Sequence, residues 1–186
     1  MTVTTLDPRS ALIVVDLQKG IVSLPTAHPA GDVVKQVRKL ADAFRGRGLP
    51  VVLVNVAGGA PGRTEQQRPR RDYAADWAEL IPELGRQPQD HLVTKHTLGA
   101  FTNTDLDAWL KAAGVTQVVV AGIATSIGVE TTARQAYELG FNVTLATDAM
   151  TDLQADPHAY SIAHVFPRIG ETGTTQEIIA LLERSA

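Results

Sequence analysis

Three short, continuous apolar runs dominate the hydrophobic pattern of the chain, at residues 11–16, 51–56 and 118–123. Runs of valine, isoleucine and leucine of this length are typical of strands that are buried on both faces, as parallel sheets require. Two weaker segments of the same kind lie at residues 91–95 and 142–147. The pattern therefore predicts five strands spread along the chain.

Between these strands, apolar residues recur every three or four positions, which is the spacing of an amphipathic helix. This spacing covers residues 33–44, 106–110, 129–139 and 174–182. Alternation of strands and helices predicts right-handed βαβ crossovers and a parallel sheet between two layers of helices. We expect an α/β fold in which residues 1–186 form one domain. Ligands of such folds bind at the carboxyl ends of the strands, so those positions come first in a search for a site.

The composition is that of a globular chain, with 44% hydrophobic and 20% charged residues. A net charge of −3 gives no electrostatic basis for binding nucleic acid or an anionic membrane. No apolar run approaches the roughly 20 residues that span a bilayer, and the N-terminus lacks the features of a signal peptide. We expect a cytoplasmic protein with a small-molecule substrate.

One extended loop, residues 58–71, follows a strand and is placed to cover a site. Its basic part, residues 63–71, is interrupted by Glu65 and Pro69. We interpret that part as a solvated loop rather than a site for a polyanion.

The chain has no cysteine, which excludes disulfides, cysteine-bound zinc and a thiolate nucleophile. No Gly-x-Gly-x-x-Gly motif follows the first strand, so a dinucleotide site has no support. The histidines do not stand at the spacing of metal ligands, and we expect neither a metal nor a cofactor. His96 is placed to orient a site group beside Lys95, although a packed or solvated histidine is the simpler interpretation. The five histidines are His28, His91, His96, His158 and His164.

Two charged residues stand at the ends of predicted strands. Asp16 is the final residue of the first strand and Lys95 ends the segment at residues 91–95. Each alone has an ordinary explanation, as a carboxylate that caps a loop or a lysine that snorkels at the surface. Together they favour a site, with Lys95 close to Asp16 if their strands are neighbours. Burial would raise the pKa of Asp16, and a nearby cation would lower it again.

The segment GIATSIGVETTAR, residues 122–134, joins a buried strand to a helix. Gly128 lies at or near the start of that helix, where free N–H groups and the helix dipole favour an anion. Thr125 and Ser126 are predicted to cap the helix, and Glu130 adds favourable charge in its first turn. No Gly-x-Ser-x-Gly elbow surrounds Ser126, so we do not expect it to be a nucleophile.

These segments, LIVVDLQKG, VTKHTLGAFTNTDLDAWL and GIATSIGVETTARQAYELGFNVTLATDAM, resemble the isochorismatase-like hydrolases from roughly residue 10 to residue 182. The resemblance implies a three-layer α/β/α sandwich with a six-stranded, mostly parallel, Rossmann-like sheet, usually assembled as a homodimer or higher homo-oligomer. Cysteine hydrolases of this superfamily use an Asp, Lys and Cys triad. Asp16 and Lys95 match the first two, and the cysteine position falls on Gly128, which closes the covalent acyl-enzyme route. The metal ligands of nicotinamidases are missing.

True isochorismatases also carry glycine at the cysteine position, and the resemblance to them implies hydrolysis of a vinyl ether. Asp16 would protonate the methylene carbon, water would add to the oxocarbenium ion, and Lys95 would bind a substrate carboxylate and tune the acid. The family also has a cis peptide before its Ala-Thr pair, here Ile123–Ala124, which would aim amides at the ligand. The alternative is a vestigial member that binds a small ligand or a protein partner. The expected substrate-binding residues are Ala124, Thr125, Ser126, Phe101 and Gln18.

Overall fold

Six parallel strands form one sheet in the computed structural model, which describes residues 3–65 and 73–184. Their spatial order is β3-β2-β1-β4-β5-β6, and every neighbouring pair runs parallel. The two central strands, β1 and β4, are buried along their whole length, as expected for a sheet covered on both faces. The strands are β1 (Ser10–Val15), β2 (Val51–Val56), β3 (His91–Lys95), β4 (Gln117–Ile123), β5 (Asn142–Thr151) and β6 (Glu171–Gly173).

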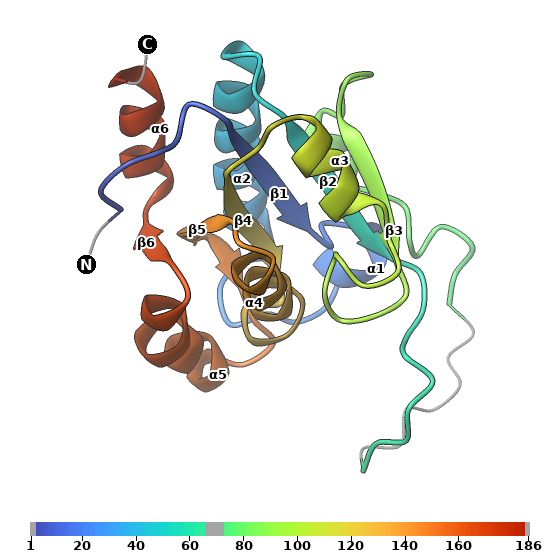
Figure 1. Cartoon of the computed structure of the whole chain (residues 1–186). Helices are drawn as coiled ribbons and strands as arrows, with labels where there is room; N and C mark the ends of the chain where they lie inside the picture. The colour runs from blue at the N-terminus through green and yellow to red at the C-terminus, as the bar shows by residue number, and fades with distance from the viewer. Residues whose placement is uncertain (1–2, 66–72, 185–186) are drawn as a thin grey trace.

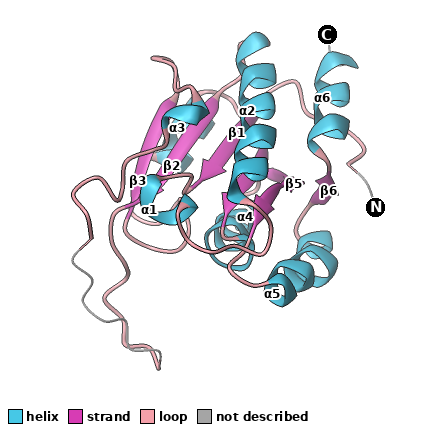
Figure 2. Cartoon of the chain, turned by 180° about the vertical axis from the view of Figure 1, so that it is seen from behind, coloured by secondary structure: helices cyan, strands magenta, loops and turns pink. Residues whose placement is uncertain are grey.

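Helices cover both faces of the sheet. Helices α3 and α4 lie on the face toward the viewer in Figure 1, and α2 and α6 cover the opposite face, seen in Figure 2. This arrangement confirms the expected three-layer α/β/α sandwich. The α-helices are α1 (Lys19–Val22), α2 (Ala30–Gly46), α3 (Leu106–Ala112), α4 (Glu130–Glu138), α5 (Ala155–Tyr160) and α6 (Thr175–Arg184). Single helical turns are η1 (Pro82–Leu84), η2 (Thr125–Val129), η3 (Ser161–Val165) and η4 (Phe166–Arg168).

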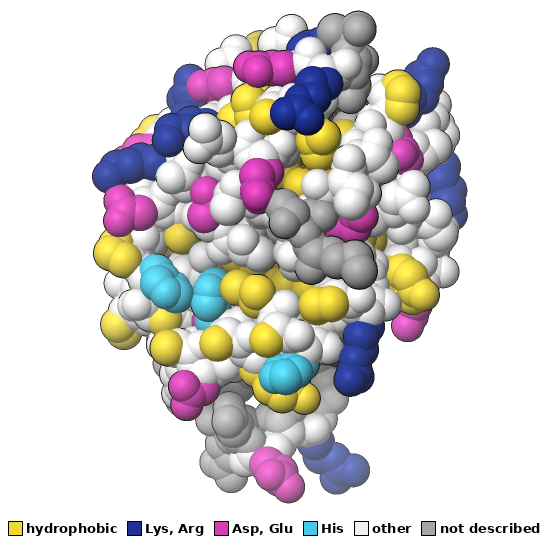
Figure 3. All heavy atoms as spheres, turned by 90° about the vertical axis from the view of Figure 1, so that its left-hand side faces the viewer, with side chains coloured by type: hydrophobic (Ala, Val, Ile, Leu, Met, Phe, Trp, Pro, Cys, Tyr) yellow, Lys and Arg dark blue, Asp and Glu magenta, His cyan; other side chains and the backbone are white. Residues whose placement is uncertain are grey.

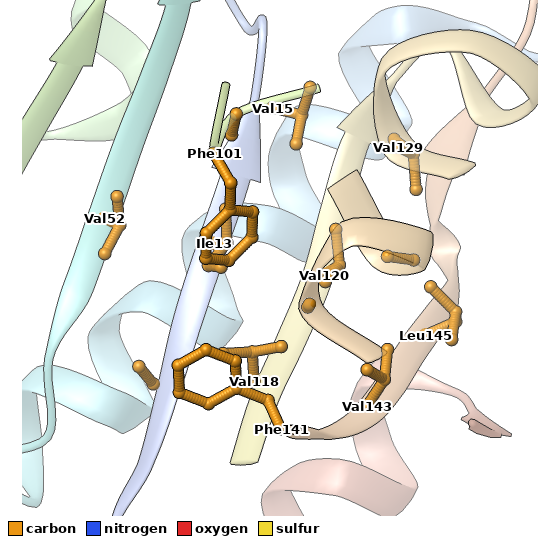
Figure 4. Packing of buried hydrophobic residues seen from close by; sticks show 14 of the residues in the cluster. Ile13, Val15, Val52, Phe101, Val118, Val120, Val129, Phe141, Val143 and Leu145 are labelled. Carbon is orange, nitrogen blue, oxygen red and sulfur yellow. The ribbon is translucent and has the colours of Figure 1, made fainter. Parts of the chain in front are cut away.

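Alternate residues of each central strand fill one of two separate cores. Ile13 and Val120 belong to the core beneath α3 and α4, shown in Figure 4, whereas Leu12 and Val119 pack on the side of α2 and α6. Because apolar side chains fill both faces, the polar side chains that could do chemistry are left at the strand ends.

The structure differs from the sequence prediction at a few boundaries. β1 ends at Val15, so Asp16 follows the strand instead of closing it. β5 extends beyond residue 147 to Thr151, with a register shift against β4. The sixth strand, which only the family resemblance implied, is the three-residue β6.

Two expectations concern segments that are exposed or only partly described. Residues 58–65 are exposed and run away from the sheet, and residues 66–72, which hold most of the basic cluster, lie outside the described residues. The idea that this loop covers a site therefore stays a prediction. Among the helices of the described ranges, none is long and apolar enough to cross a membrane.

Candidate active site

The site begins at Asp16, where the chain leaves β1 in an unusual backbone conformation. Asp16 has a φ of 54°, in the left-handed region that few residues other than glycine adopt. Its neighbour Val15 pairs with Gly122 of β4. A side chain on Gly122 would collide with the carbonyl oxygen of Val15. Close packing of the two strand ends and a left-handed turn therefore place the Asp16 carboxylate at the carboxyl edge of the sheet, and such outliers often mark functional sites.

Lys95 forms an ion pair with Asp16, with 2.9 Å between its Nζ and Oδ2 of Asp16. The Lys95 ammonium also donates to the carbonyl oxygen of Leu98 at 2.5 Å. The strands that carry the two residues are not neighbours, because β2 lies between β1 and β3. The pair forms anyway, since the long lysine side chain reaches past the end of β2. The side chains of Lys95 and Asp16 are only 1% and 8% exposed.

The electrostatic environment of Asp16 suits it to donate a proton. Burial raises the pKa of Asp16 from 3.8 to about 6, although the charge and hydrogen bond of Lys95 lower it in part. One carboxylate oxygen, Oδ1, is buried and has no hydrogen-bond partner in the described structure. A carboxyl group that holds its proton up to about pH 6 and has an unused oxygen suits general acid–base chemistry.

Gly128 faces the same ion pair from the turn η2. A Cβ atom at position 128 would lie 3.2 Å from both Oδ2 of Asp16 and Nζ of Lys95, and 3.0 Å from Val15. A side chain here would thus point straight at the pair, and it would also be tightly crowded. The three residues expected to form the site therefore meet in space.

The turn at residues 124–128, called here the site turn, is fixed by contacts that sequence reasoning did not foresee. The Ile123–Ala124 peptide is cis, as expected. Neither Thr125 nor Ser126 caps the helix with its side chain. The helix cap prediction was wrong because a π-helical turn precedes α4, which begins at Glu130.

Both residues are instead bound by the segment that follows β5. The Thr125 hydroxyl lies 2.8 Å from Nδ1 of His158, and the Ser126 N–H donates to Asp152 at 2.6 Å. Asp152 and His158 were not singled out from the sequence. Asp152 follows β5 directly, so the rule that ligands gather at strand ends would have found it.

Two expected substrate-binding residues serve the interior instead. Gln18 is fully buried, and its side-chain amide bonds the backbone of Val56 and Trp77. Phe101 lies in the core beneath α4 (Figure 4), with its ring 6.1 Å from that of Phe141. In this conformation neither side chain is free to contact a substrate, because hydrogen bonding in one case and apolar packing in the other already engage it.

Three of the histidines, His91, His96 and His164, lie apart from one another. His96 is exposed and lies against Gly58, and His91 stacks on Trp109. His164 is exposed beside Tyr160. Across the described ranges, no group of three or more His, Asp or Glu side chains is arranged to hold a metal ion.

A groove of about 590 Å³ borders the site turn at Ser126. It runs along α4 and the α5–η3 segment, with Glu130 and Arg134 on one side and Tyr160 and His164 on the other. Its lining includes charged residues of both signs, whereas Asp16 and Lys95 do not line it.

Comparison with known proteins identifies relatives along almost the whole chain. A family model described as Isochorismatase domain matches residues 10–177. The chain is 41% identical over 178 residues to the uncharacterized isochorismatase family protein YwoC of Bacillus subtilis, covering 92% of this chain and 93% of that protein. It is 29% identical over 222 residues to ureidoacrylate amidohydrolase RutB of Rhizobium rhizogenes, covering 98% and 87%. An isochorismatase family protein from Burkholderia thailandensis has a structure similar to this one, with a TM-score of 0.92, 42% identity, and coverage of 96% and 98%.

Proposed function

The chain belongs to the isochorismatase family of hydrolases, and we propose that it hydrolyses a small carboxylated metabolite by acid catalysis from Asp16, without a covalent intermediate. The observation that carries this proposal is the state of Asp16. Its carboxyl group is buried, has a pKa of about 6, and keeps one oxygen without a hydrogen-bond partner in the described structure.

The absence of cysteine separates this chain from the amide-hydrolysing members that use a thiolate. The crowded Cβ direction at Gly128 supports the assignment of that residue to the nucleophile's position. Glycine has no side-chain atom that could attack a carbonyl carbon. A reaction that begins with proton transfer fits the remaining Asp16–Lys95 pair better than amide hydrolysis does.

Hydrolysis of a vinyl ether of the isochorismate type needs such a proton. Asp16 would give its proton to the methylene carbon, which leaves an oxocarbenium ion. Water would add to that ion and lose a proton, and the hemiketal would collapse to a ketone and an alcohol. The carboxylate of Asp16 is then ready to take up a proton from water. Lys95 would stabilise that carboxylate, and its ammonium, already bonded to Asp16 and Leu98, has one further N–H for a substrate carboxylate.

A direct assay tests the proposal. Purified protein is incubated with isochorismate and, separately, with a panel of small amides, and release of pyruvate or ammonia is followed. We expect turnover of the vinyl ether that falls tenfold per pH unit above about pH 6, because the acid form of Asp16 is lost there. Asp16→Asn should slow turnover by about 10²–10⁴-fold.

The matched control is Asp32→Asn, an exposed carboxylate on α2 that should leave the rate unchanged. Activity of Asp16→Asn within a few-fold of wild type would refute the role of Asp16 as the acid.

The burial of the Asp16–Lys95 pair favours one second candidate function. In it, the chain is a family member that binds a small ligand without converting it. Lys95 and Asp16 have almost no exposed surface. Binding of isochorismate by calorimetry, with no product after prolonged incubation, would support that candidate over catalysis.

A further inference from the structure

A second polar cluster, separate from the Asp16–Lys95 pair, holds the site turn. Asp152 is 2% exposed and accepts the backbone N–H groups of Ser126 at 2.6 Å and Leu153 at 2.7 Å. His158, on α5, contacts the Thr125 hydroxyl through its Nδ1 at 2.8 Å. Two consecutive residues of the site turn are therefore tied to the segment that follows β5.

His28 brings a second imidazole ring to this cluster. The His28 and His158 rings lie 4.8 Å apart between centroids, with their planes tilted by 56°. The backbone of the His28 loop is anchored to the end of β5, since the N–H of His28 donates to Thr151 at 3.1 Å and that of Ala27 to the Asp152 carbonyl at 2.8 Å. Figure 3 shows histidine side chains next to hydrophobic side chains on the lower half of this face.

The contact between Thr125 and His158 is not a nucleophile with its base. Thr125 is fully buried, and its hydroxyl is already engaged with Nδ1 of His158. A bond between a buried hydroxyl and an imidazole fixes geometry instead.

We propose that Asp152 and His158 are positioning residues of the candidate active site, and that protonation of His158 loosens the site turn that they hold. The catalytic consequence rests on the proposed function, because movement of this turn would carry Gly128 away from Asp16 and Lys95. The structural part of the proposal does not need that function.

The charges around His158 fix the direction of the pH dependence. Burial lowers the pKa of His158 below its ordinary value of 6.5, His28 lowers it further, and Asp152 raises it in part. Asp156 is the other acidic group on the same helix, and it is exposed. A lowered pKa means that a proton on His158 costs free energy in the folded arrangement. The contact between His158 and the site turn is therefore fully stabilising above pH 6.5 and weakens as the pH falls below that value.

Hydrogen exchange of the Ser126 amide, followed by NMR between pH 5 and pH 8 and corrected for the intrinsic chemical rate, tests this proposal without any substrate. In wild type we expect protection to fall by about threefold to tenfold toward low pH, the range of one net hydrogen bond. His158→Asn places an amide where Nδ1 stood, so it should keep the protection and remove the pH dependence. His158→Ala should lose the protection at every pH. His28→Ala should move the transition to higher pH, because a positive neighbour is gone.

Two controls separate this effect from others. The Ala100 amide, bonded to the Thr132 hydroxyl, reports global unfolding in each variant. Asp16 also titrates near pH 6, so Asp16→Asn must keep the transition. If the transition disappears in Asp16→Asn, or if His158→Ala protects Ser126 as well as wild type does, the proposal is wrong. If only the isochorismate assay fails, the proposed function is refuted, whereas the positioning role of Asp152 and His158 is not.

Discussion

Replacing Asp16 by asparagine should make the folded chain more stable at neutral pH, by an amount that grows with pH. Asparagine has the shape of a protonated aspartate but cannot ionise. It also tolerates the left-handed backbone found at this position. The replacement therefore removes the cost of ionising a buried carboxyl group. Lys95 then faces an uncharged partner, as it does in wild type when Asp16 is protonated.

The magnitude follows from the protonation of Asp16. A rise in its pKa from 3.8 to about 6 corresponds to roughly 3 kcal/mol of free energy of unfolding. The folded state holds its proton more tightly than the unfolded state, so wild type loses this amount as the pH rises from 3.8 to about 6. The variant should match wild type at pH 3.5 and exceed it by up to about 3 kcal/mol at pH 8. In thermal unfolding at pH 8 this corresponds to about 6–12 °C.

Urea unfolding at pH values from 3.5 to 8, followed by the fluorescence of Trp77 and Trp109, measures this difference. Asp32→Asn is the control, because its side chain is 64% exposed and should change stability by less than about 0.5 kcal/mol. The reasoning would be refuted by a variant that is less stable than wild type at pH 8, or by a difference that does not vary with pH. Either result would show that folding does not disfavour the ionised form of Asp16. A gain in stability with loss of turnover would mark Asp16 as a residue kept for function.

Three further predictions concern the same site. Lys95→Met should lower the free energy of unfolding by about 3–5 kcal/mol at pH 8 and by much less at pH 4, because only an ionised Asp16 needs the buried counter-ion. Urea unfolding at the two pH values checks this, and equal losses would contradict it. Gly128→Ala should lower the free energy of unfolding by about 1–3 kcal/mol through crowding against Val15 and Asp16. Gly31→Ala, in the open first turn of α2, should cost nothing. Thermal unfolding of both variants checks this, and equal melting temperatures would show that the site turn accepts a side chain without strain. Dialysis against EDTA should leave any hydrolase activity unchanged, and elemental analysis that finds near-stoichiometric metal lost together with activity would overturn our interpretation of the histidines.

The strand-end rule found the ion pair from sequence because it depends only on where buried runs stop. Asp16 and Lys95 each follow or end such a run, and parallel strands bring those ends to one edge. The rule did not give the strand order, which depends on how the helices cross. Whether β1 and β3 are neighbours was therefore left open, and β2 lies between them.

Other residues of the site could not be predicted because their roles depend on tertiary partners. Gln18 stands two positions after Asp16, yet its role was decided by backbone groups of Val56 and Trp77, far along the chain. Threonine is a residue type that often caps helices. The Thr125 hydroxyl instead contacts His158, which lies outside the local sequence. Helices as short as α1 and α5 show too few turns for a hydrophobic period. The expected homo-oligomer stays a prediction.

The packing around Gly128 also bears on how this chain can evolve. A glycine codon of the GGT or GGC type becomes a cysteine codon through a single base change, so a thiol at this position is within easy mutational reach. The physical route is narrower, because the first carbon of that side chain would lie 3.0–3.2 Å from Val15, Asp16 and Lys95. The side chains of these neighbours would have to shift by a few tenths of an ångström to admit the thiol. The codon change is therefore simple, and whether a cysteine is accepted here depends on how far Val15, Asp16 and Lys95 can move.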